Sequence, residues 1–232
     1  MRQIPLAVKL KDSATFGTYC AGPNGLAVAY LKSLVERGIG PGCWLWGGAG
    51  CGKSHLLQAL CGAAAERDRP IAYLPMTQIG PMGPGALEGW SDQEIVAVDD
   101  IDTMVGDADL EGALFRLYND LAERSGALVV ASDAPPSGLD FTLPDLRSRL
   151  VAGAVFHLVA LDEADAIEAL QCRADYRGLE LPDDTARFLL RRVPRDMGSL
   201  CDWLDRLDLA SLAAKRRLTV PFVRDVLAGD TD

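Results

Sequence analysis

Gly47-Gly48-Ala49-Gly50-Cys51-Gly52-Lys53-Ser54 fills every fixed position of the phosphate-loop pattern. Glycines let such a loop curl so that successive backbone N–H groups point toward phosphate oxygens. Lys53 supplies a positive charge for the terminal phosphates, and the Ser54 hydroxyl is suited to bind Mg²⁺. The helix expected to begin at Lys53 adds its positive dipole end. We therefore predict that these residues bind a nucleotide together with Mg²⁺, in preference to forming a glycine-rich turn without a ligand.

Alternating strand and helix patterns surround this loop and indicate the fold class. Short apolar strands are predicted at 43–46, 71–74, 95–98, 128–131 and 154–158. Helices are predicted at 25–35, 53–66 and 110–123, and the stretch at 80–85, which contains two prolines, is predicted to be a loop. Such strands, separated by helices, are typical of a parallel sheet that is buried on both faces. We predict an α/β core with a five-stranded parallel sheet.

The pattern changes after Leu161, where strands are no longer predicted. Helices are expected at 162–176, 183–192, 197–214 and 221–227. Asp162, with Asp165 three residues later, and Pro182 suit helix starts. We predict three parts, which are an N-terminal arm (1–20), a nucleotide-binding α/β core (21–160) and a small all-helical lid domain (161–232).

Carboxylates follow two of the predicted strands. Asp99 and Asp100 come directly after the apolar run Ile95–Val98. In P-loop proteins the first such acid holds Mg²⁺ through water, and the next can orient the attacking water. We predict Asp99 on the metal side and Asp100 as the catalytic candidate, with slow hydrolysis because Asp is shorter than Glu. Asp133, after the strand at 128–131, is predicted to sense the phosphate or the water, although a turn start explains it nearly as well.

Composition narrows the classes of partner and compartment. The net charge of −10 disfavours broad binding to the phosphate backbone of DNA, so we expect little direct DNA binding. No apolar run approaches the roughly 20 residues that span a bilayer, and the N-terminus lacks the apolar core of a signal peptide. Six cysteines without a CxxC pair indicate reduced thiols, with no zinc site and no disulfide framework. We predict a cytoplasmic protein without a membrane partner.

Several stretches, taken in order, resemble the DnaA branch of AAA+ proteins over nearly the whole chain. They are Gly50–Leu57, Val98–Ile101, Leu143–Leu150, Leu179–Leu190 and Leu218–Val223. The phosphate loop is shared by many ATPases, and the C-terminal stretches are much more specific. Within this branch the chain is most similar to the DnaA-related regulators that inactivate the replication initiator DnaA. The resemblance implies a P-loop AAA+ core followed by a helical lid.

The resemblance also implies a mechanism and its partners. Such regulators bind adenine nucleotide, usually ADP, dock on the DNA-loaded beta sliding clamp of DNA polymerase III, and stimulate DnaA to hydrolyse its bound ATP. Arg149 matches the family's arginine finger, which stabilises transition-state charge, and Arg147 is the fallback. Gln3-Ile4-Pro5-Leu6 matches the clamp-binding peptide, with Ile4 where leucine is common. From the residues alone, a solvated helix face and an unstructured terminus are the simpler interpretations of these two segments.

Two departures from the family pattern bear on the protein's own catalysis. AAA+ lids usually supply an arginine to the phosphates, but Gly198 stands at that position, and Arg195 would leave the helix start in another direction. We therefore expect weak or no ATP hydrolysis by the protein itself. Cys51 lies inside the phosphate loop near a helix N-terminus, where oxidation of the thiol would block nucleotide binding.

Two other functions share the same core and stay open. An autonomous AAA+ ATPase of the helicase-loader type would show DNA-stimulated turnover. A DnaA paralogue that only tethers DnaA would tolerate charge reversal at Arg149. The clamp-like N-terminus and the missing lid arginine favour the regulator. The sequence leaves open whether ADP or ATP is preferred, and it is compatible with a homodimer that hides Arg149.

Overall fold

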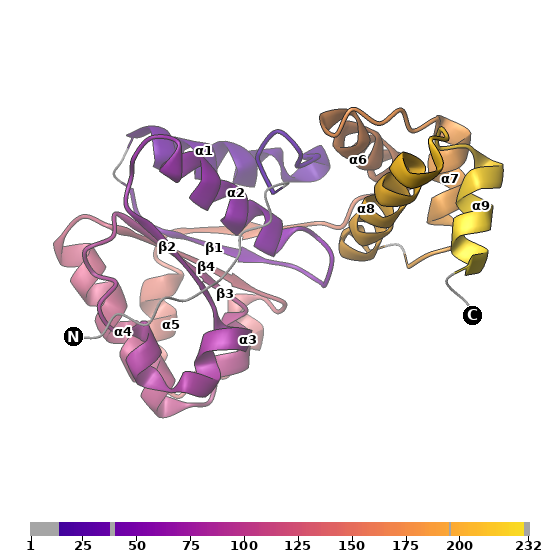
Figure 1. The fold of residues 1–232 in the computed structure, drawn as a ribbon. Helices are drawn as coiled ribbons and strands as arrows, with labels where there is room; N and C mark the ends of the chain where they lie inside the picture. The colour runs from indigo at the N-terminus through magenta and orange to yellow at the C-terminus, as the bar shows by residue number, and fades with distance from the viewer. Residues whose placement is uncertain (1–13, 38–39, 195, 230–232) are drawn as a thin grey trace. The chain divides into compact units, whose positions relative to one another are not determined.

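The computed structural model describes residues 14–37, 40–194 and 196–229, and these form two compact units (Figure 1). The first unit holds Asn24–Gly48 and Lys53–Val159, together with the described residues before Gly17. The second unit holds Gly17–Pro23, Ala49–Gly52 and the chain from Ala160 onward. Each unit has a hydrophobic core of its own.

Within the described residues, a five-stranded parallel sheet forms the centre of the first unit, as predicted. Its strands are β1 (Cys43–Trp46), β2 (Ile71–Pro75), β3 (Ile95–Asp99), β4 (Ala127–Ser132) and β5 (Ala154–His157). They lie in the order β2-β3-β4-β1-β5, and each pairing is parallel. Parallel strands run in one direction, so all of them end at the same edge of the sheet, where ligands bind in folds of this class.

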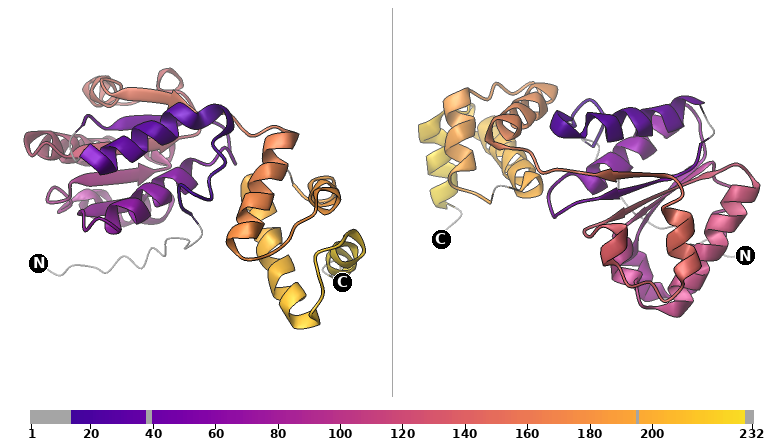
Figure 2. Two further views of the ribbon diagram at one scale, coloured as in Figure 1. Left: turned by 90° about the horizontal axis from the view of Figure 1, so that it is seen from above. Right: turned by 180° about the vertical axis from the view of Figure 1, so that it is seen from behind.

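Helices cover both faces of the sheet (Figures 1 and 2). The helices of this unit are α1 (Gly25–Arg37), α2 (Lys53–Ala65), α3 (Met76–Ile79), α4 (Ala108–Glu123) and α5 (Pro144–Leu150). α1 and α2 lie on one face, and α4 and α5 lie on the other. Fully buried Trp44, Val98, Leu114 and Leu146 belong to the core on the α4 side. Cover on both faces explains why β3 and β4 are buried along their whole length.

The stretch at 80–85 is not the irregular loop that the sequence predicted. α3 follows β2 directly, and 3-10 turns follow at Gly80–Met82 and Pro84–Leu87. A proline stands at the start of each turn, where its fixed φ suits a helical start and its missing N–H is not needed. Buried Ile79 and Leu87 attach this run to the core. Further 3-10 turns lie at Gly22–Asn24, Ile101–Met104 and Pro136–Gly138.

The second unit is helical, which confirms the predicted lid fold. Its helices are α6 (Glu163–Tyr176), α7 (Asp183–Leu190), α8 (Met197–Ala214) and α9 (Val220–Gly229). The side chain of Asp162 caps α6 by accepting from the Asp165 N–H, and Asp196 caps α8 in the same way. Leu170, Leu189 and Leu204 are fully buried at the centre of this unit. No helix in the described ranges combines the length and the apolar character needed to cross a bilayer.

Asn24, directly before α1, is hydrogen-bonded to Val159, which lies two residues after the end of β5. Its side-chain amide donates to the Val159 carbonyl at 3.0 Å, and its Oδ1 accepts from the Val159 N–H at 2.9 Å. Residue 24 is 3% exposed, so its polar atoms have little access to water as a substitute partner. The pair closes a loop of 135 residues and thereby joins the two ends of the first unit.

We predict that Asn24→Ala lowers the free energy of unfolding by about 1–3 kcal/mol, because backbone groups of Val159 lose their partners. Urea denaturation measures this change. Asn119→Ala on α4 serves as the matched control and should stay within about 0.5 kcal/mol of the wild-type protein. An Asn24→Ala protein as stable as the control would contradict the prediction.

Candidate nucleotide-binding site

The phosphate loop leaves the end of β1 and opens α2, the context that its motif requires. Gly50 and Gly52 adopt φ angles of +79° and +94°, which residues with a side chain rarely tolerate. The Gly47 N–H donates to the Ser132 carbonyl at 3.2 Å, so the loop begins against the end of β4. The two left-handed glycines explain how the loop turns between a strand and a helix.

Lys53 is almost fully buried at the first residue of α2. Its ammonium donates to the Gly47 carbonyl at 2.6 Å and to the Gly48 carbonyl at 3.3 Å. It also pairs with Asp133 Oδ1 at 2.7 Å, although the Asp133 side chain is largely exposed. Asp133, predicted as a phosphate or water sensor, therefore contacts the lysine of the phosphate loop. A bound phosphate would compete with this carboxylate for the same ammonium.

Tyr19 lies against the phosphate loop, which the sequence did not predict. Its hydroxyl donates to the Cys51 carbonyl at 3.3 Å. A Cβ atom on Gly52 would come within 2.6 Å of Cε2 of the Tyr19 ring, so position 52 has a second reason to be glycine. Cys51 itself is buried in this arrangement. A tyrosine near the N-terminus carries no periodic signal, and only the folded chain brings it to the loop.

Asp99, predicted on the metal side, is 1% exposed at the end of β3. Tyr73 on the neighbouring β2 donates its hydroxyl to Asp99 Oδ2 at 2.7 Å. The Asp100 N–H donates to Asp99 Oδ1 at 3.1 Å. These bonds fix the orientation of the carboxylate while each oxygen keeps a free lone pair. Burial, followed by the nearby Asp99 charge, raises the pKa of the Tyr73 hydroxyl, so it stays a hydrogen-bond donor at neutral pH.

Asp100, predicted as the catalytic candidate, has a left-handed backbone with φ of +55°. Thr77 Oγ1 on α3 donates to Asp100 Oδ2 at 3.3 Å. Burial is the main cause that raises the pKa of the Asp100 carboxyl, and the charges of Asp99, Asp102 and Asp133 raise it further. The Asp133 N–H donates to Asp102 Oδ1 at 3.1 Å, which joins the residues after β3 to the end of β4. Strained backbone and crowded acids mark this strand end as a functional candidate.

Ser54 and Asp99 fit a magnesium ion by their chemistry. Mg²⁺ prefers oxygen ligands, keeps several waters, and is held by one or two protein groups plus substrate phosphates. Ser54 is the second residue of α2, next to Lys53, and Asp99 offers an oriented buried carboxylate. Among the described residues, no group of three or more His, Cys, Asp or Glu side chains is arranged to hold a metal ion. A site completed by phosphate oxygens matches this distribution of ligands.

Arg149, predicted as the arginine finger, lies exposed on α5. Its guanidinium carbon is 5.5 Å from the ring centre of Phe115 and 5.9 Å from that of Tyr118, both on α4. Within residues 14–37, 40–194 and 196–229, no carboxylate forms an ion pair with it. Among these same residues, Arg147 is exposed on α5 without such a ring contact. The geometry therefore distinguishes Arg149 from the fallback arginine.

Some residues named from the sequence cannot be placed. Gln3, Ile4, Pro5 and Leu6, predicted to bind the clamp, and Arg195 lie outside the described residues. Gly198 is the second residue of α8. The two histidines pack against the protein, since His55 Nε2 lies 2.9 Å from the Thr15 carbonyl oxygen and the His157 ring stacks on the Trp46 ring with 3.9 Å between the ring centroids.

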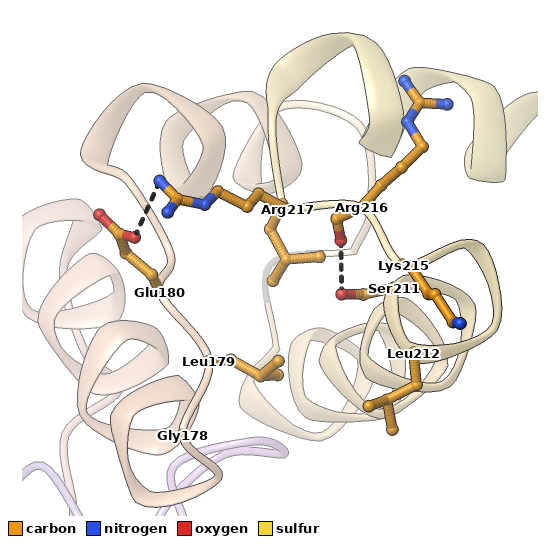
Figure 3. Close-up of a pocket in the computed structure, with 9 residues that line it drawn as sticks. Gly178, Leu179, Glu180, Ser211, Leu212, Lys215, Arg216 and Arg217 are labelled. Carbon is orange, nitrogen blue, oxygen red and sulfur yellow. Dashed lines mark hydrogen bonds and ion pairs between the residues drawn. The ribbon is translucent and has the colours of Figure 1, made fainter.

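The second unit contains a hollow of about 430 Å³ (Figure 3). Lys215, Arg216 and Arg217 stand beside it after α8 ends, where cations complement the helix dipole. Arg217 faces Glu180 at 3.9 Å, and Arg216 pairs with Asp225 at 3.5 Å. Because Arg216 and Arg217 are each paired with an acidic residue of the same unit, we assign no ligand to the hollow.

Three protein-family models match different stretches of the chain. Residues 162–227 match the model of the Hda lid domain. Residues 88–157 match the model of the bacterial DnaA ATPase domain, and residues 43–122 match an RNA helicase model. The helicase match starts at β1 and includes the phosphate loop, which many nucleotide-binding proteins share.

Solved structures share the fold at low sequence identity. Domain III of the replication initiation protein DnaA from Thermotoga maritima is 22% identical, with a TM-score of 0.79 over 96% of this chain and 98% of that one. AMPPCP-bound DnaA from Aquifex aeolicus is 22% identical, with a TM-score of 0.71 over 86% of this chain and 66% of that one. The Thermotoga maritima RuvB branch migration motor is 18% identical, with a TM-score of 0.65 over 89% and 67%.

The sheet order, the phosphate loop and the helical second unit give this chain the fold of the AAA+ proteins. The lid and ATPase-domain matches narrow the class further. Residues 88–157 and 162–227 are thus similar to two families of the Hda/DnaA branch of the AAA+ proteins.

We predict that Lys53→Ala weakens ADP binding at least about tenfold, because a hydrogen bond to a charged group contributes roughly 1.5–3 kcal/mol. Isothermal titration calorimetry measures the affinity. Lys32→Ala on α1, where the ammonium lies over the Phe16 ring at 5.6 Å, is the matched control and should bind ADP normally. Equal ADP affinity of the Lys53 and Lys32 variants would refute the assignment of the phosphate site.

We predict that Asp100→Asn stabilises the protein at about pH 7 and that this gain shrinks toward about pH 4. The folded-state pKa of Asp100 is raised above its unfolded value, so the ionised carboxylate destabilises the fold at neutral pH. Below the unfolded pKa the carboxyl is protonated in both states, and the difference disappears. Urea denaturation over this pH range measures it. A gain that grows as the pH falls would contradict the assigned direction.

Proposed function

We propose that the protein regulates the replication initiator DnaA. In this proposal it holds adenine nucleotide, docks on the DNA-loaded sliding clamp, and stimulates hydrolysis of the ATP bound to DnaA. The match of residues 162–227 to the Hda lid domain carries the proposal, because the core alone is shared with many other ATPases. Lower levels of DnaA-ATP would keep replication from restarting too early.

Arg149 is the group that we assign to catalysis in trans. During phosphoryl transfer, charge spreads over the oxygens of the transferred group, and an arginine from a second protein stabilises it. Arg149 is exposed, and no carboxylate among the described residues neutralises it. An arginine with these properties is suited to enter the nucleotide site of DnaA.

The protein's own nucleotide has a supporting role in this proposal. Lys53, Ser54 and Asp99 have the chemistry to hold phosphate and Mg²⁺. AAA+ lids usually supply an arginine where Gly198 stands, and glycine brings no charge to the phosphates. Asp100 is also a shorter base than Glu. We therefore infer weak or absent turnover at this site and a stable ADP-bound adaptor.

Gln3-Ile4-Pro5-Leu6 is the proposed clamp contact. An extended peptide that contains proline can place Ile4 and Leu6 in an apolar pocket while Gln3 makes a polar contact. The same peptide would bring Arg149 to DNA-bound DnaA by raising its effective concentration there.

An autonomous ATPase of the helicase-loader type is the second candidate. The complete phosphate loop and the paired acids Asp99 and Asp100 favour it, because they are the parts that a self-sufficient ATPase needs. If this candidate is right, the protein hydrolyses ATP without DnaA, and the addition of DNA raises the rate. The regulator requires turnover only at the nucleotide of DnaA.

We predict that the protein stimulates hydrolysis of DnaA-bound ATP when the clamp is loaded on DNA. Arg149→Ala should lower the stimulated rate on the order of 10³-fold, as loss of an arginine finger does. The double variant Gln3→Ala/Leu6→Ala should lose the dependence on clamp. Release of inorganic phosphate in single-turnover reactions measures both effects.

Arg147→Ala is the matched control, since Arg147 lies on the same helix and should keep most of the stimulation. Loss of stimulation in Arg147→Ala with normal activity of Arg149→Ala would move the finger to Arg147. No stimulation by the folded, ADP-loaded wild-type protein would refute the regulator. DNA-stimulated turnover without DnaA would then support the loader.

A further inference from the structure

Glu111 is a buried carboxylate that the nucleotide site does not use. It lies in the first turn of α4 and is 0% exposed. Its Oε1 accepts from the N–H groups of Gly106 at 2.8 Å and Thr142 at 3.1 Å, and its Oε2 accepts from the Leu143 N–H at 2.8 Å. Thr142 and Leu143 are the residues that lead into α5. One carboxylate on α4 therefore holds the start of α5.

The guanidinium group of Arg149 lies against the same side of α4. Residues 111, 115 and 118 follow spacings of four and three, which place them on one stripe of a helix. The first of these residues binds the backbone before α5, and the aromatic rings of the other two lie under the Arg149 guanidinium. This stripe, Glu111, Phe115 and Tyr118, is called the α4 platform below.

The rest of α5 fits this arrangement. Leu146 and Leu150, which flank Arg149, are buried in the core beside α4. The N-cap residue Leu143 has no side-chain hydrogen bond of its own, and Pro144 follows it. The helix thus relies on Glu111 for its N-terminal backbone contact and on the leucines for its inner face. Arg149 is exposed on this helix, and its guanidinium lies over the rings of Phe115 and Tyr118.

We propose that the α4 platform sets the position of Arg149, with Glu111 as a positioning residue, and this inference rests on the proposed function. A free arginine side chain samples many rotamers, and ordering it upon binding costs affinity or rate. Glu111 fixes where the backbone of α5 begins, and the rings of Phe115 and Tyr118 restrict where the guanidinium lies. The arginine is therefore placed before DnaA binds.

The first test compares the wild-type protein with Glu111→Gln and with Phe115→Leu/Tyr118→Leu in the DnaA-ATP hydrolysis assay. Both variants should lower the maximum stimulated rate about tenfold, because small displacements of a catalytic group are costly. The concentration that gives half-maximal stimulation should stay unchanged. Phe188→Leu is the matched control, since Arg192 and Arg224 lie over its ring at 5.2 and 5.7 Å in the second unit. A raised half-maximal concentration with an unchanged maximum would show a docking surface and overturn the inference.

Double variants separate positioning from general damage to the fold. In an Arg149→Ala background, the changes at positions 111, 115 and 118 should have no further effect on the rate, because they act only through Arg149. Full additivity with Arg149→Ala would refute positioning.

A third measurement is independent of DnaA. The rings should shift the NMR signals of the Arg149 side chain upfield, and Phe115→Leu/Tyr118→Leu should abolish that shift. Glu111→Gln should move the same signals, and the Thr142 and Leu143 amides of the wild-type protein should exchange slowly. Unshifted arginine signals or fast exchange of both amides would overturn the platform even if DnaA is stimulated. A shifted arginine in a wild-type protein that fails to stimulate DnaA would refute the proposed function and leave the platform intact.

Discussion

Parallel pairing of β1 with β4 and of β4 with β3 is the constraint on which the site depends. It brings the ends of these strands to one edge of the sheet, although long stretches of chain separate them. At that edge the Gly47 N–H meets the Ser132 carbonyl, and Lys53 pairs with Asp133. The backbone of Asp133 is in turn held by Asp102, after β3. The phosphate loop thus takes its position from the two strands beside it as well as from its own glycines.

The crossover between β3 and β4 serves two sites. It begins with Asp100, directly after Asp99 at the end of β3 in the candidate nucleotide site, and its helix α4 carries the α4 platform under Arg149. Glu111 shows how the connection is made, since one buried carboxylate joins the turn before α4 to the segment before α5. A buried charge is costly unless hydrogen bonds satisfy it, and the backbone donors supply that compensation. The candidate nucleotide site and the proposed action in trans therefore share one structural element.

The sequence predicted the parts of this protein whose signals are local. Apolar runs located the strands, and glycine spacing located the phosphate loop, because periodicity and backbone freedom are properties of neighbouring residues. The prediction of a loop at 80–85 was wrong. The prolines were taken as signs of irregular structure, but in the fold they stand at the start of 3-10 turns. Tyr19, Tyr73 and Glu111 were missed because each has a partner 26 to 32 residues away, and no local pattern reports such contacts. Arg149 was found through family resemblance, and only the fold showed the rings beneath it.

In the proposed function the protein acts on a nucleotide that another protein holds. A radioactive label on only one of the two nucleotides shows directly which nucleotide is hydrolysed. DnaA is loaded with γ-labelled ATP, this protein is loaded with unlabelled ADP, and both are mixed in one turnover with clamp on DNA. If the protein acts in this way, labelled phosphate is released faster when this protein is present. An unchanged rate, with both proteins folded and loaded, would contradict it.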